Sequence, residues 1–295
     1  MPILSRLAAL LVPQEVSGRV QSEGVYLPFI QNQGAKIYWD EQGAGDPVLL
    51  IMGLAYPSDS WYRTRPVLSK TYRTIVIDNR GVGRSDMPPG PYPIALMAAD
   101  ALAVLDAAGV ERAHVYGISM GGMIAQELTL QHPGRVRSLI LGCTAAGGPT
   151  AIGAEPEVTK VLMARGVMTP EEAAEAAVPY VYDAGTPRAR IDEDLNVRRP
   201  WLARPEAYMA QLQGILAWES YSRLPQINVP TLVVHGENDR LVPVGNGKLI
   251  ASRIPGAKLV LLPHASHIYP TDQTAASDRA ILEFLAAQSA RSSTA

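Results

Sequence analysis

Several features that mark whole classes of protein are missing from this sequence of 295 residues. Cys143 is its only cysteine, so the chain cannot form an internal disulfide bond, and we interpret this residue as a core thiol compatible with a reducing compartment. No internal repeat is visible. The apolar stretch at residues 7–12 is too short to span a bilayer, so the sequence does not predict a membrane protein.

A surplus of charge of either sign is also missing. Lysine and arginine together number 26 and aspartate and glutamate 28, which gives a formal net charge of −2, and no basic run is present. Proteins that bind nucleic acids or anionic membranes need a positively charged surface. The sequence therefore argues against both kinds of partner, and against a polyanionic substrate.

Residues 1–24 form an extension ahead of the periodic part of the chain. A single positive charge, Arg6, precedes the apolar stretch at residues 7–12, and no clear small-residue cleavage site follows it, so we expect no secretory signal peptide. We predict instead an amphipathic helix packed on the body of the protein, and a cytoplasmic location.

From Gly34 onward the chain alternates between short apolar runs and segments with helical spacing. Such alternation is typical of an α/β fold, in which helices cover a mostly parallel sheet. Several runs are continuous in valine, isoleucine and leucine, as expected for strands buried on both faces. The predicted strands are residues 36–40, 48–52, 74–78, 113–116, 136–142, 231–235 and 258–262, and the predicted helices are residues 94–108, 120–131, 246–254 and 271–287.

The alternation stops after Gly142 and resumes at Val229, and the residues between them have helical spacing, prolines and no convincing strand. Thr169, followed by Pro170 and two glutamates, predicts the start of a helix. A helical insert at the carboxyl edge of a parallel sheet lies where a lid over a ligand would lie. We therefore predict an α/β core of residues 25–144 and 224–288, a helical cap of residues 145–223 and a disordered tail of residues 289–295.

Ser119 lies at the centre of Gly-Ile-Ser-Met-Gly, residues 117–121, between an apolar strand and a helical segment. A strand, a tight turn and a helix with serine at the turn form a nucleophile elbow. The flanking glycines allow a strained turn, and the N–H groups at the start of the helix point toward the group that the serine attacks. This context, more than the motif alone, predicts a nucleophilic serine.

A serine hydroxyl needs a base, and the base needs an orienting partner. Three of the five histidines, His114, His132 and His235, are best explained as structural because they lie within strand patterns or at a helix end. His264 and His267 follow the last predicted strand, where a loop could carry an imidazole over the sheet edge. We predict His267 as the base because it lies further into the loop, with His264 as the alternative.

The orienting carboxylate should also follow a strand. Asp239 comes shortly after an apolar strand and precedes residues 241–243, which would partly bury it. A desolvated aspartate beside an imidazole holds its tautomer and stabilises the imidazolium. We predict Asp239 for this role, with Glu237 as the alternative, so that Ser119, Asp239 and His267 form a catalytic triad.

The negative charge that develops on an attacked carbonyl oxygen requires preorganised N–H donors. We predict the backbone N–H groups of Met120, which follows the serine, and of Leu54, which follows a buried strand and Gly53. Glycine at position 53 permits a close approach of the backbone. The predicted substrate contacts are Gly53, Trp61 and Trp218.

These motifs together resemble the α/β-hydrolase superfamily, whose members have the chain order Ser, Asp or Glu, His. The resemblance rests on residues 117–122, on Asp-Asn-Arg-Gly-Val-Gly-Arg-Ser-Asp at residues 78–86, on Gly-Glu-Asn-Asp at residues 236–239 and on His267.

Residues 120–141 are similar in particular to the bacterial serine esterase, enol-lactonase and non-haem haloperoxidase-like branches. The resemblance covers residues 34–142 and 225–287, and it implies the α/β-hydrolase fold, a mostly parallel sheet flanked by helices with an inserted α-helical cap. It also implies structural roles for Arg80 and Asp86, which would shape a loop beneath the site.

Two positions depart from the family pattern. Met52 stands where many relatives have histidine at the oxyanion turn, and Ser266 stands where relatives usually have glycine before the terminal histidine. Neither change removes a member of the triad. Ser119 also argues against dehalogenases and soluble epoxide hydrolases, which use aspartate at the elbow.

The sequence thus predicts a hydrolase that needs no cofactor or metal and cleaves carboxylic esters of small, largely apolar molecules through an acyl-enzyme. Its partner would be a small-molecule ester or lactone. Alternatives with the same triad are a lactonase and a hydrolase of carbon–carbon bonds, for which Arg198, Arg199 and Arg204 could supply cationic contacts. A ligand receptor on a hydrolase scaffold is a further alternative. The identity of the substrate and the oligomeric state are not predicted.

Overall fold

The structure, a computed structural model, describes residues 20–22 and 25–292. The helix predicted at residues 7–12 lies outside this part of the chain. Two short strands, β1 (Val20–Ser22) and β2 (Val25–Leu27), pair antiparallel ahead of the main sheet. None of the helices in the described residues combines the length and the hydropathy that a membrane span requires.

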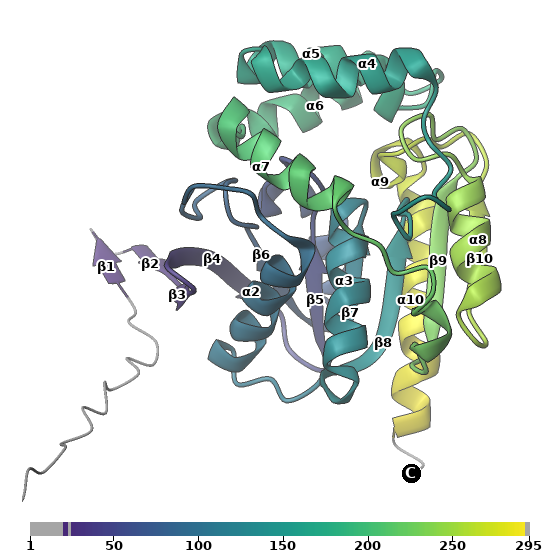
Figure 1. Cartoon of the computed structure of the whole chain (residues 1–295). Helices are drawn as coiled ribbons and strands as arrows, with labels where there is room; N and C mark the ends of the chain where they lie inside the picture. Colours follow the sequence, from purple (N-terminus) through teal and green to yellow (C-terminus); the bar gives the residue numbers. More distant parts are fainter. Residues whose placement is uncertain (1–19, 23–24, 293–295) are drawn as a thin grey trace, which may run out of the picture.

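Among the described residues, eight strands form a central sheet in the order β10-β9-β8-β7-β5-β6-β4-β3 (Figure 1). Neighbours between β6 and β10 pair in parallel, whereas β4 pairs antiparallel with both β6 and β3. The strands are β3 (Phe29–Asn32), β4 (Ala35–Gln42), β5 (Pro47–Ile51), β6 (Arg73–Ile77), β7 (Ala113–Ile118), β8 (Val136–Gly142), β9 (Thr231–Gly236) and β10 (Lys258–Leu262).

All seven predicted strands are present, and the predicted fold class is confirmed. The sequence does not predict β3. This strand is four residues long, lies at the edge of the sheet and has polar side chains at two of its positions, Gln31 and Asn32. Such a strand buries little apolar surface, so it leaves a weak hydrophobic pattern.

The central strands are buried on both faces. Leu49 and Ile51 of β5 pack in one core cluster with residues of α2, α3 and α8, whereas Leu50 packs in a second cluster with residues of α1 and α10. Neighbouring side chains of a strand point to opposite faces, so both positions must be apolar. These helices are α1 (Arg65–Leu68), α2 (Ile94–Ala107), α3 (Met120–Gln131), α8 (Gly245–Arg253) and α10 (Thr274–Ser292).

The predicted helix at residues 271–287 is divided in the structure. A short helix, α9 (Tyr269–Asp272), ends before Gln273, and α10 begins at Thr274. Since α10 continues to Ser292, the prediction of a disordered tail from residue 289 is corrected for residues 289–292. The hydroxyl of Ser289 donates a hydrogen bond of 3.0 Å to Oδ2 of Asp46, which ties this turn to the loop before β5.

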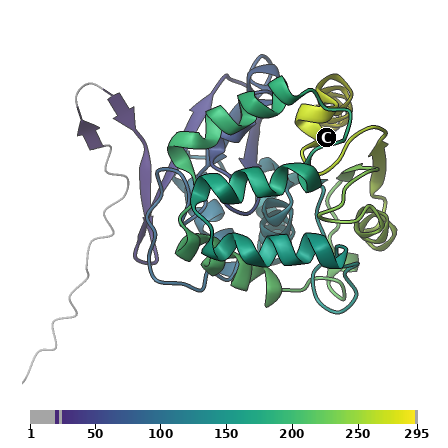
Figure 2. The ribbon, with the colours of Figure 1, turned by 90° about the horizontal axis from the view of Figure 1, so that it is seen from above.

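The segment between β8 and β9 is helical, as predicted, and lies over the carboxyl edge of the sheet (Figures 1 and 2). Thr169 begins α5 with a capping box, in which its hydroxyl accepts from the N–H of Glu172 and its N–H donates to the Glu172 carboxylate. The helices of this insert are α4 (Pro156–Ala164), α5 (Pro170–Val181), α6 (Arg188–Arg198) and α7 (Pro205–Leu216).

A fully buried side chain of α7 ties the insert to the core. Oε1 of Gln211 accepts a hydrogen bond of 2.8 Å from the backbone N–H of Ala55. Its Nε2 donates to the backbone carbonyl of Arg80 at 2.9 Å. Ala55 lies in the turn after β5 and Arg80 in the loop after β6, so α7 is bonded to two loops at the carboxyl edge of the sheet.

Candidate active site

Ser119 occupies the turn between β7 and α3 with φ 58° and ψ −123°. A positive φ is uncommon for residues other than glycine and marks a strained backbone. Two glycines make the tight turn possible. A Cβ atom on Gly117 would lie 2.1 Å from the carbonyl oxygen of Gly121, and one on Gly121 would lie 2.1 Å from the carbonyl oxygen of Ile51. The predicted strand, turn and helix are therefore present around this serine.

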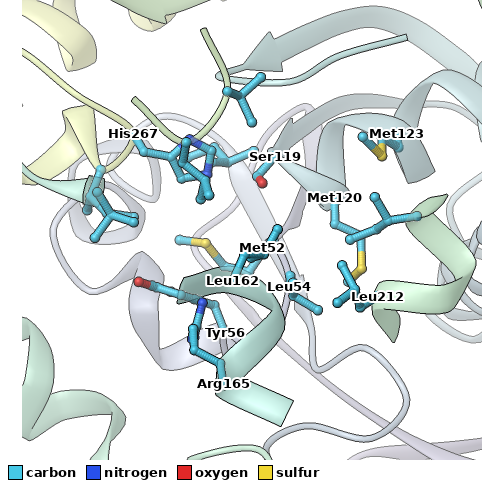
Figure 3. Close-up of a pocket in the computed structure, with 17 residues that line it drawn as sticks. Met52, Leu54, Tyr56, Ser119, Met120, Met123, Leu162, Arg165, Leu212 and His267 are labelled. Carbon is cyan, nitrogen blue, oxygen red and sulfur yellow. The ribbon is translucent and has the colours of Figure 1, made fainter. Parts of the chain in front are cut away.

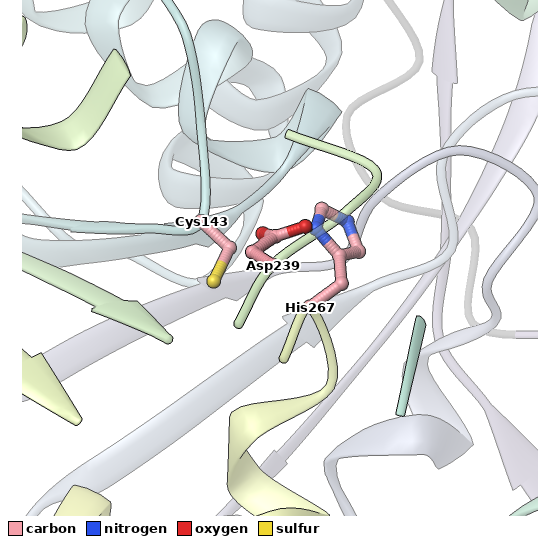
Figure 4. A group of neighbouring side chains, drawn as sticks. All are labelled: Cys143, Asp239 and His267. Atoms are coloured by element: carbon pink, nitrogen blue, oxygen red, sulfur yellow. The ribbon is translucent and has the colours of Figure 1, made fainter. Parts of the chain in front are cut away.

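The two residues predicted as the orienting carboxylate and the base, Asp239 and His267, are adjacent. Nδ1 of His267 lies 2.8 Å from Oδ2 of Asp239, and both residues are buried (Figure 4). Oδ1 of Asp239 accepts hydrogen bonds from the backbone N–H groups of Leu241 and Val242 at 2.9 and 2.8 Å. A carboxylate only accepts, so the bridging hydrogen belongs to Nδ1, and Nε2 of the neutral ring carries the lone pair of a base.

A second histidine supports the same carboxylate. Burial by itself would raise the pKa of Asp239, but the imidazoles of His267 and His235 outweigh this effect and hold the pKa well below its usual range. Nε2 of His235 lies 3.4 Å from Oδ2 of Asp239 and donates to the carbonyl of Val242 at 2.8 Å. Asp239 is therefore ionised at neutral pH although it is buried.

Cys143 lies beside this pair. Its Sγ, a carboxylate oxygen of Asp239 and a ring nitrogen of His267 all lie within 4.8 Å of one another (Figure 4). Burial raises the pKa of the Cys143 thiol well above its usual value, so the free thiol is neutral. The thiol also bonds locally, accepting from the N–H of Gly236 at 3.5 Å and donating to the carbonyl of Ser266 at 3.7 Å. These contacts fit the predicted core thiol better than a metal ligand.

Ser119 and His267 line one cavity of about 180 Å³, which lies between the carboxyl edge of the sheet and the insert (Figure 3). We refer to it as the Ser119 cavity. The insert contributes residues of α4, η3 (Arg165–Val167), α5 and α7, and the core contributes residues at or beyond the carboxyl ends of β5, β7, β9 and β10. Most of the wall is apolar, including Met52, Leu54, Met123, Leu162, Leu212 and Ile215.

The residues predicted for the oxyanion hole border this cavity. Met120, Leu54 and Gly53 all line it. Met120 is the first residue of α3, and the N–H groups of a helix's first turn have no partner within the helix. A Cβ atom on Gly53 would lie 2.9 Å from Cβ of Ser119, so the turn after β5 passes very close to the serine.

Comparison with known proteins places this arrangement in a family. Residues 46–176 match the family model described as alpha/beta hydrolase fold. Over 251 residues the chain is 34% identical to "Putative carbamate hydrolase RutD" of Azorhizobium caulinodans, with 82% of this chain and 92% of that protein covered. The chain belongs to the α/β-hydrolase family.

Two further comparisons agree with this membership. The hydrolase is 30% identical over 236 residues to the pimeloyl-[acyl-carrier protein] methyl ester esterase of Aeromonas hydrophila subsp. hydrophila, with 76% of this chain and 89% of that protein covered. The enol-lactonase from Burkholderia xenovorans LB400 is similar in structure, with a TM-score of 0.80, 26% identity, and coverage of 88% of this chain and 100% of that chain. The resemblance and the α/β-hydrolase fold inferred from the sequence are thereby confirmed.

Two residues predicted to contact substrate in this α/β-hydrolase do not line the Ser119 cavity. Trp61 is buried against Tyr116 in the core cluster on the α10 face of the sheet, with ring centroids 4.8 Å apart. Trp218 packs in the other core cluster and donates from Nε1 to Glu127 at 2.8 Å. Both predictions are corrected, because each ring is used for packing. Gly53 is the predicted contact that does line the cavity.

Glu237 and His264, the alternative predictions for the orienting carboxylate and the base, are exposed and do not line the cavity. Conversely, two polar residues of the wall were not predicted. Tyr56 lies two residues beyond Leu54, so its position close to the oxyanion turn could have indicated it. Arg165 lies in the insert, and no local motif distinguishes it from the other arginines there.

Proposed function

We propose that this hydrolase cleaves carboxylic esters of small, largely apolar molecules through an acyl-enzyme on Ser119, without a cofactor. One observation carries the proposal: the strained Ser119 lines a single cavity together with His267, which is hydrogen-bonded to the buried Asp239. A nucleophile, a base and a carboxylate that orients the base are the parts that nucleophilic acyl transfer requires.

The first half-reaction forms the acyl-enzyme. Oγ of Ser119 attacks the carbonyl carbon while Nε2 of His267 accepts the hydroxyl proton. The backbone N–H groups of Met120 and Leu54 stabilise the oxyanion that develops on the carbonyl oxygen. The imidazolium then donates its proton to the leaving alcohol as the carbon–oxygen bond of the ester breaks.

The second half-reaction releases the acid. His267 accepts a proton from water, the resulting nucleophile attacks the acyl carbonyl, and the proton returns to Oγ of Ser119 as the acyl bond breaks. Throughout both steps Asp239 accepts the Nδ1–H bond and stabilises the imidazolium. Its lowered pKa supports this role, because the carboxylate stays ionised in its buried position.

The cavity supports a small and largely apolar substrate. Its volume of about 180 Å³ is below the roughly 300–1,000 Å³ of pockets that hold drug-sized ligands. The wall is mostly methionine, leucine and isoleucine, which favours an apolar acyl or alcohol group.

A lactone is the second candidate substrate, since its ring opens by the same steps and the structurally similar Burkholderia protein is an enol-lactonase. Cleavage of carbon–carbon bonds has less support. Of the three arginines considered for it, Arg199 and Arg204 are exposed, and Arg198 is buried beside a smaller pocket next to the Ser119 cavity. A ligand receptor has less support still, because binding alone does not need an oriented base.

Stopped-flow release of p-nitrophenol from acetate, butyrate and octanoate esters tests the proposal. The unmodified protein should show a burst followed by steady turnover, and Ser119→Ala should abolish both. Ser252→Ala, a change at an exposed serine of α8, is the matched control and should leave the rates unchanged. If no ester reacts but a lactone is opened in a pH-stat, the enzyme is a lactonase. Saturable binding without any Ser119-dependent turnover would identify a receptor.

A further inference from the structure

Arg165 places a positive charge on the wall of the Ser119 cavity. It is the first residue of η3 (Arg165–Val167), which packs against α4, α5 and α7. Its side chain lines the cavity together with Ser119, and only 9% of the residue is exposed. Figure 3 shows Arg165 on the side of the cavity opposite Ser119 and His267.

Among the described residues, this guanidinium has no counter-charge. No carboxylate of the described residues lies within ion-pair distance of Arg165, and its buried Nε has no hydrogen-bond partner among them. Its Cζ lies 4.8 Å from the ring centroid of Tyr208. A cation–π contact of this kind stabilises the charge by about 0.5–2 kcal/mol, which is less than the cost of removing a charge from water.

The other buried arginine near the cavity is bonded within the insert. Nε of Arg198 donates to the backbone carbonyl of Asp194 at 3.1 Å, and its Nη2 donates to the hydroxyl of Tyr182 at 3.3 Å. The negative charge of the Asp194 carboxylate also stabilises the Arg198 guanidinium. Arg165 likewise has a tyrosine partner, because its side chain interacts with the hydroxyl of Tyr208. It differs from Arg198 in lining the Ser119 cavity with no carboxylate of the described residues to stabilise its charge.

Buried charges in proteins are normally paired. A buried arginine that lines a ligand cavity without a negatively charged partner is explained when the ligand brings the opposite charge. We propose that Arg165 binds a carboxylate of the substrate, at the end of the cavity away from Ser119. The inference rests on the proposed function and makes it more specific: the acyl or alcohol group is largely apolar but ends in a carboxylate.

A carboxylate fits this position better than a phosphate. The planar fork of a guanidinium matches the two oxygens and the single charge of a carboxylate. A phosphate monoester would bring nearly two negative charges, whereas Arg165 is the sole arginine or lysine among the described residues that line the cavity. The predicted substrate class is therefore half-esters of short dicarboxylic acids, and lactones that carry a carboxylate.

Matched ester pairs that differ only in charge test this assignment. Initial rates are measured in a pH-stat for the monomethyl and dimethyl esters of succinate, glutarate and adipate. The unmodified enzyme should prefer the half-ester of at least one acid. Arg165→Met should lower kcat/KM for that half-ester by about 10–100-fold, mainly through KM, because one charge-assisted contact is lost. It should change kcat/KM for the diester less than about threefold, and Arg165→Lys should restore part of the half-ester activity.

Two controls separate this contact from general effects. Arg204→Met removes an exposed arginine of the same insert and should leave both kinds of ester unaffected. The melting temperature of Arg165→Met should equal or exceed that of the unmodified protein, because an unpaired buried charge has been removed. A preference for the diester of every acid, or an equal loss on both kinds of ester, would overturn the assignment.

A binding measurement keeps this inference distinct from the proposed function. Calorimetric titration of Ser119→Ala with succinate, glutarate and adipate needs no turnover. Binding of at least one diacid should be measurable and should disappear when Arg165→Met is added. Diacid binding without ester hydrolysis in the unmodified protein would contradict the proposed function and uphold the carboxylate site. Ser119-dependent ester hydrolysis without diacid binding would uphold the function and contradict the site.

Discussion

Nδ1 of His267 donates a hydrogen bond of 2.8 Å to Oδ2 of Asp239, which joins the loop after β10 to the loop after β9. These two strands are parallel neighbours in the sheet, so the loops that follow them leave from the same edge. The contact is therefore a consequence of the topology. It brings together residues that are 28 positions apart in the sequence.

Asp239→Asn should lower kcat for ester hydrolysis by about 10³–10⁴-fold with little change in KM, because an amide no longer holds the imidazole in the required tautomer. Steady-state kinetics on p-nitrophenyl butyrate measure both constants. The matched controls are Glu237→Gln and His264→Asn, which alter exposed residues of the same two loops. A loss of similar size in either control would show that the acid or base has been assigned to the wrong residue.

Gly53→Ala should lower kcat by about 10–100-fold, because the new Cβ would displace the serine from its attacking position. The added atom would lie 2.9 Å from Cβ of Ser119 and 3.3 Å from the carbonyl oxygen of Ile118. Gly134→Ala is the control, since a Cβ there meets no atom within 4 Å. Full activity of Gly53→Ala would mean that the turn after β5 has room to move away from the serine.

Asp100→Asn should destabilise the fold by about 3–5 kcal/mol, because it leaves the buried charge of Arg80 without its partner. Asp100 accepts from Nε and Nη2 of Arg80 at 2.7 and 2.6 Å, and neither side chain is more than 2% exposed. Urea unfolding measures the change. Glu41→Gln removes the half-exposed partner of Arg73 and should cost less than about 1 kcal/mol. Equal effects of the two changes would contradict the structural role assigned to Arg80.

Asp278→Asn should raise the melting temperature at alkaline pH and leave it nearly unchanged at pH 4. Asp278 is buried in α10, its Oδ1 has no hydrogen-bond partner among the described residues, and burial raises its pKa to about 6. An unfolded aspartate has a pKa of about 3.9. Between these values the folded protein keeps a proton that the unfolded chain has lost, so stability falls as pH rises through this window, and the loss persists above it.

Thermal unfolding at pH 4 and pH 8 checks this expectation. The substitution should stabilise the protein by about 1–2 kcal/mol at pH 8, which corresponds to a few degrees. Glu283→Gln, at an exposed position of the same helix, should have no comparable effect. A gain of equal size at both pH values would show that ionisation of Asp278 is not its cause.

The sheet could be predicted from the sequence because burial on both faces leaves continuous apolar runs such as Val48 to Ile51. The adjacency of Asp239 and His267 could be predicted for a related reason. Each follows a strand of a parallel sheet, and chain order with strand polarity places such loops at one edge. The conformation of Ser119 is likewise encoded locally, in the glycines beside it.

The walls of the cavity could not be predicted in this way. Trp61 and Trp218 are large and apolar, but whether such a residue faces a cavity or a core depends on how helices pack against one another, which no local pattern records. The burial of Arg165 could not be predicted for the same reason. An arginine in a helical segment is normally a solvated surface residue, and only the packing of α4, α5 and α7 around it removes it from water.

The two hydrogen bonds of Gln211 link the position of α7 to the turn after β5. Lifting α7 from the core would break both bonds and pull on Ala55, which is adjacent to the proposed donor Leu54. The hydroxyl of Tyr208 in α7 also donates to the carbonyl of Leu162 in α4 at 2.7 Å. The position of the insert and the shape of the oxyanion turn are therefore mechanically coupled.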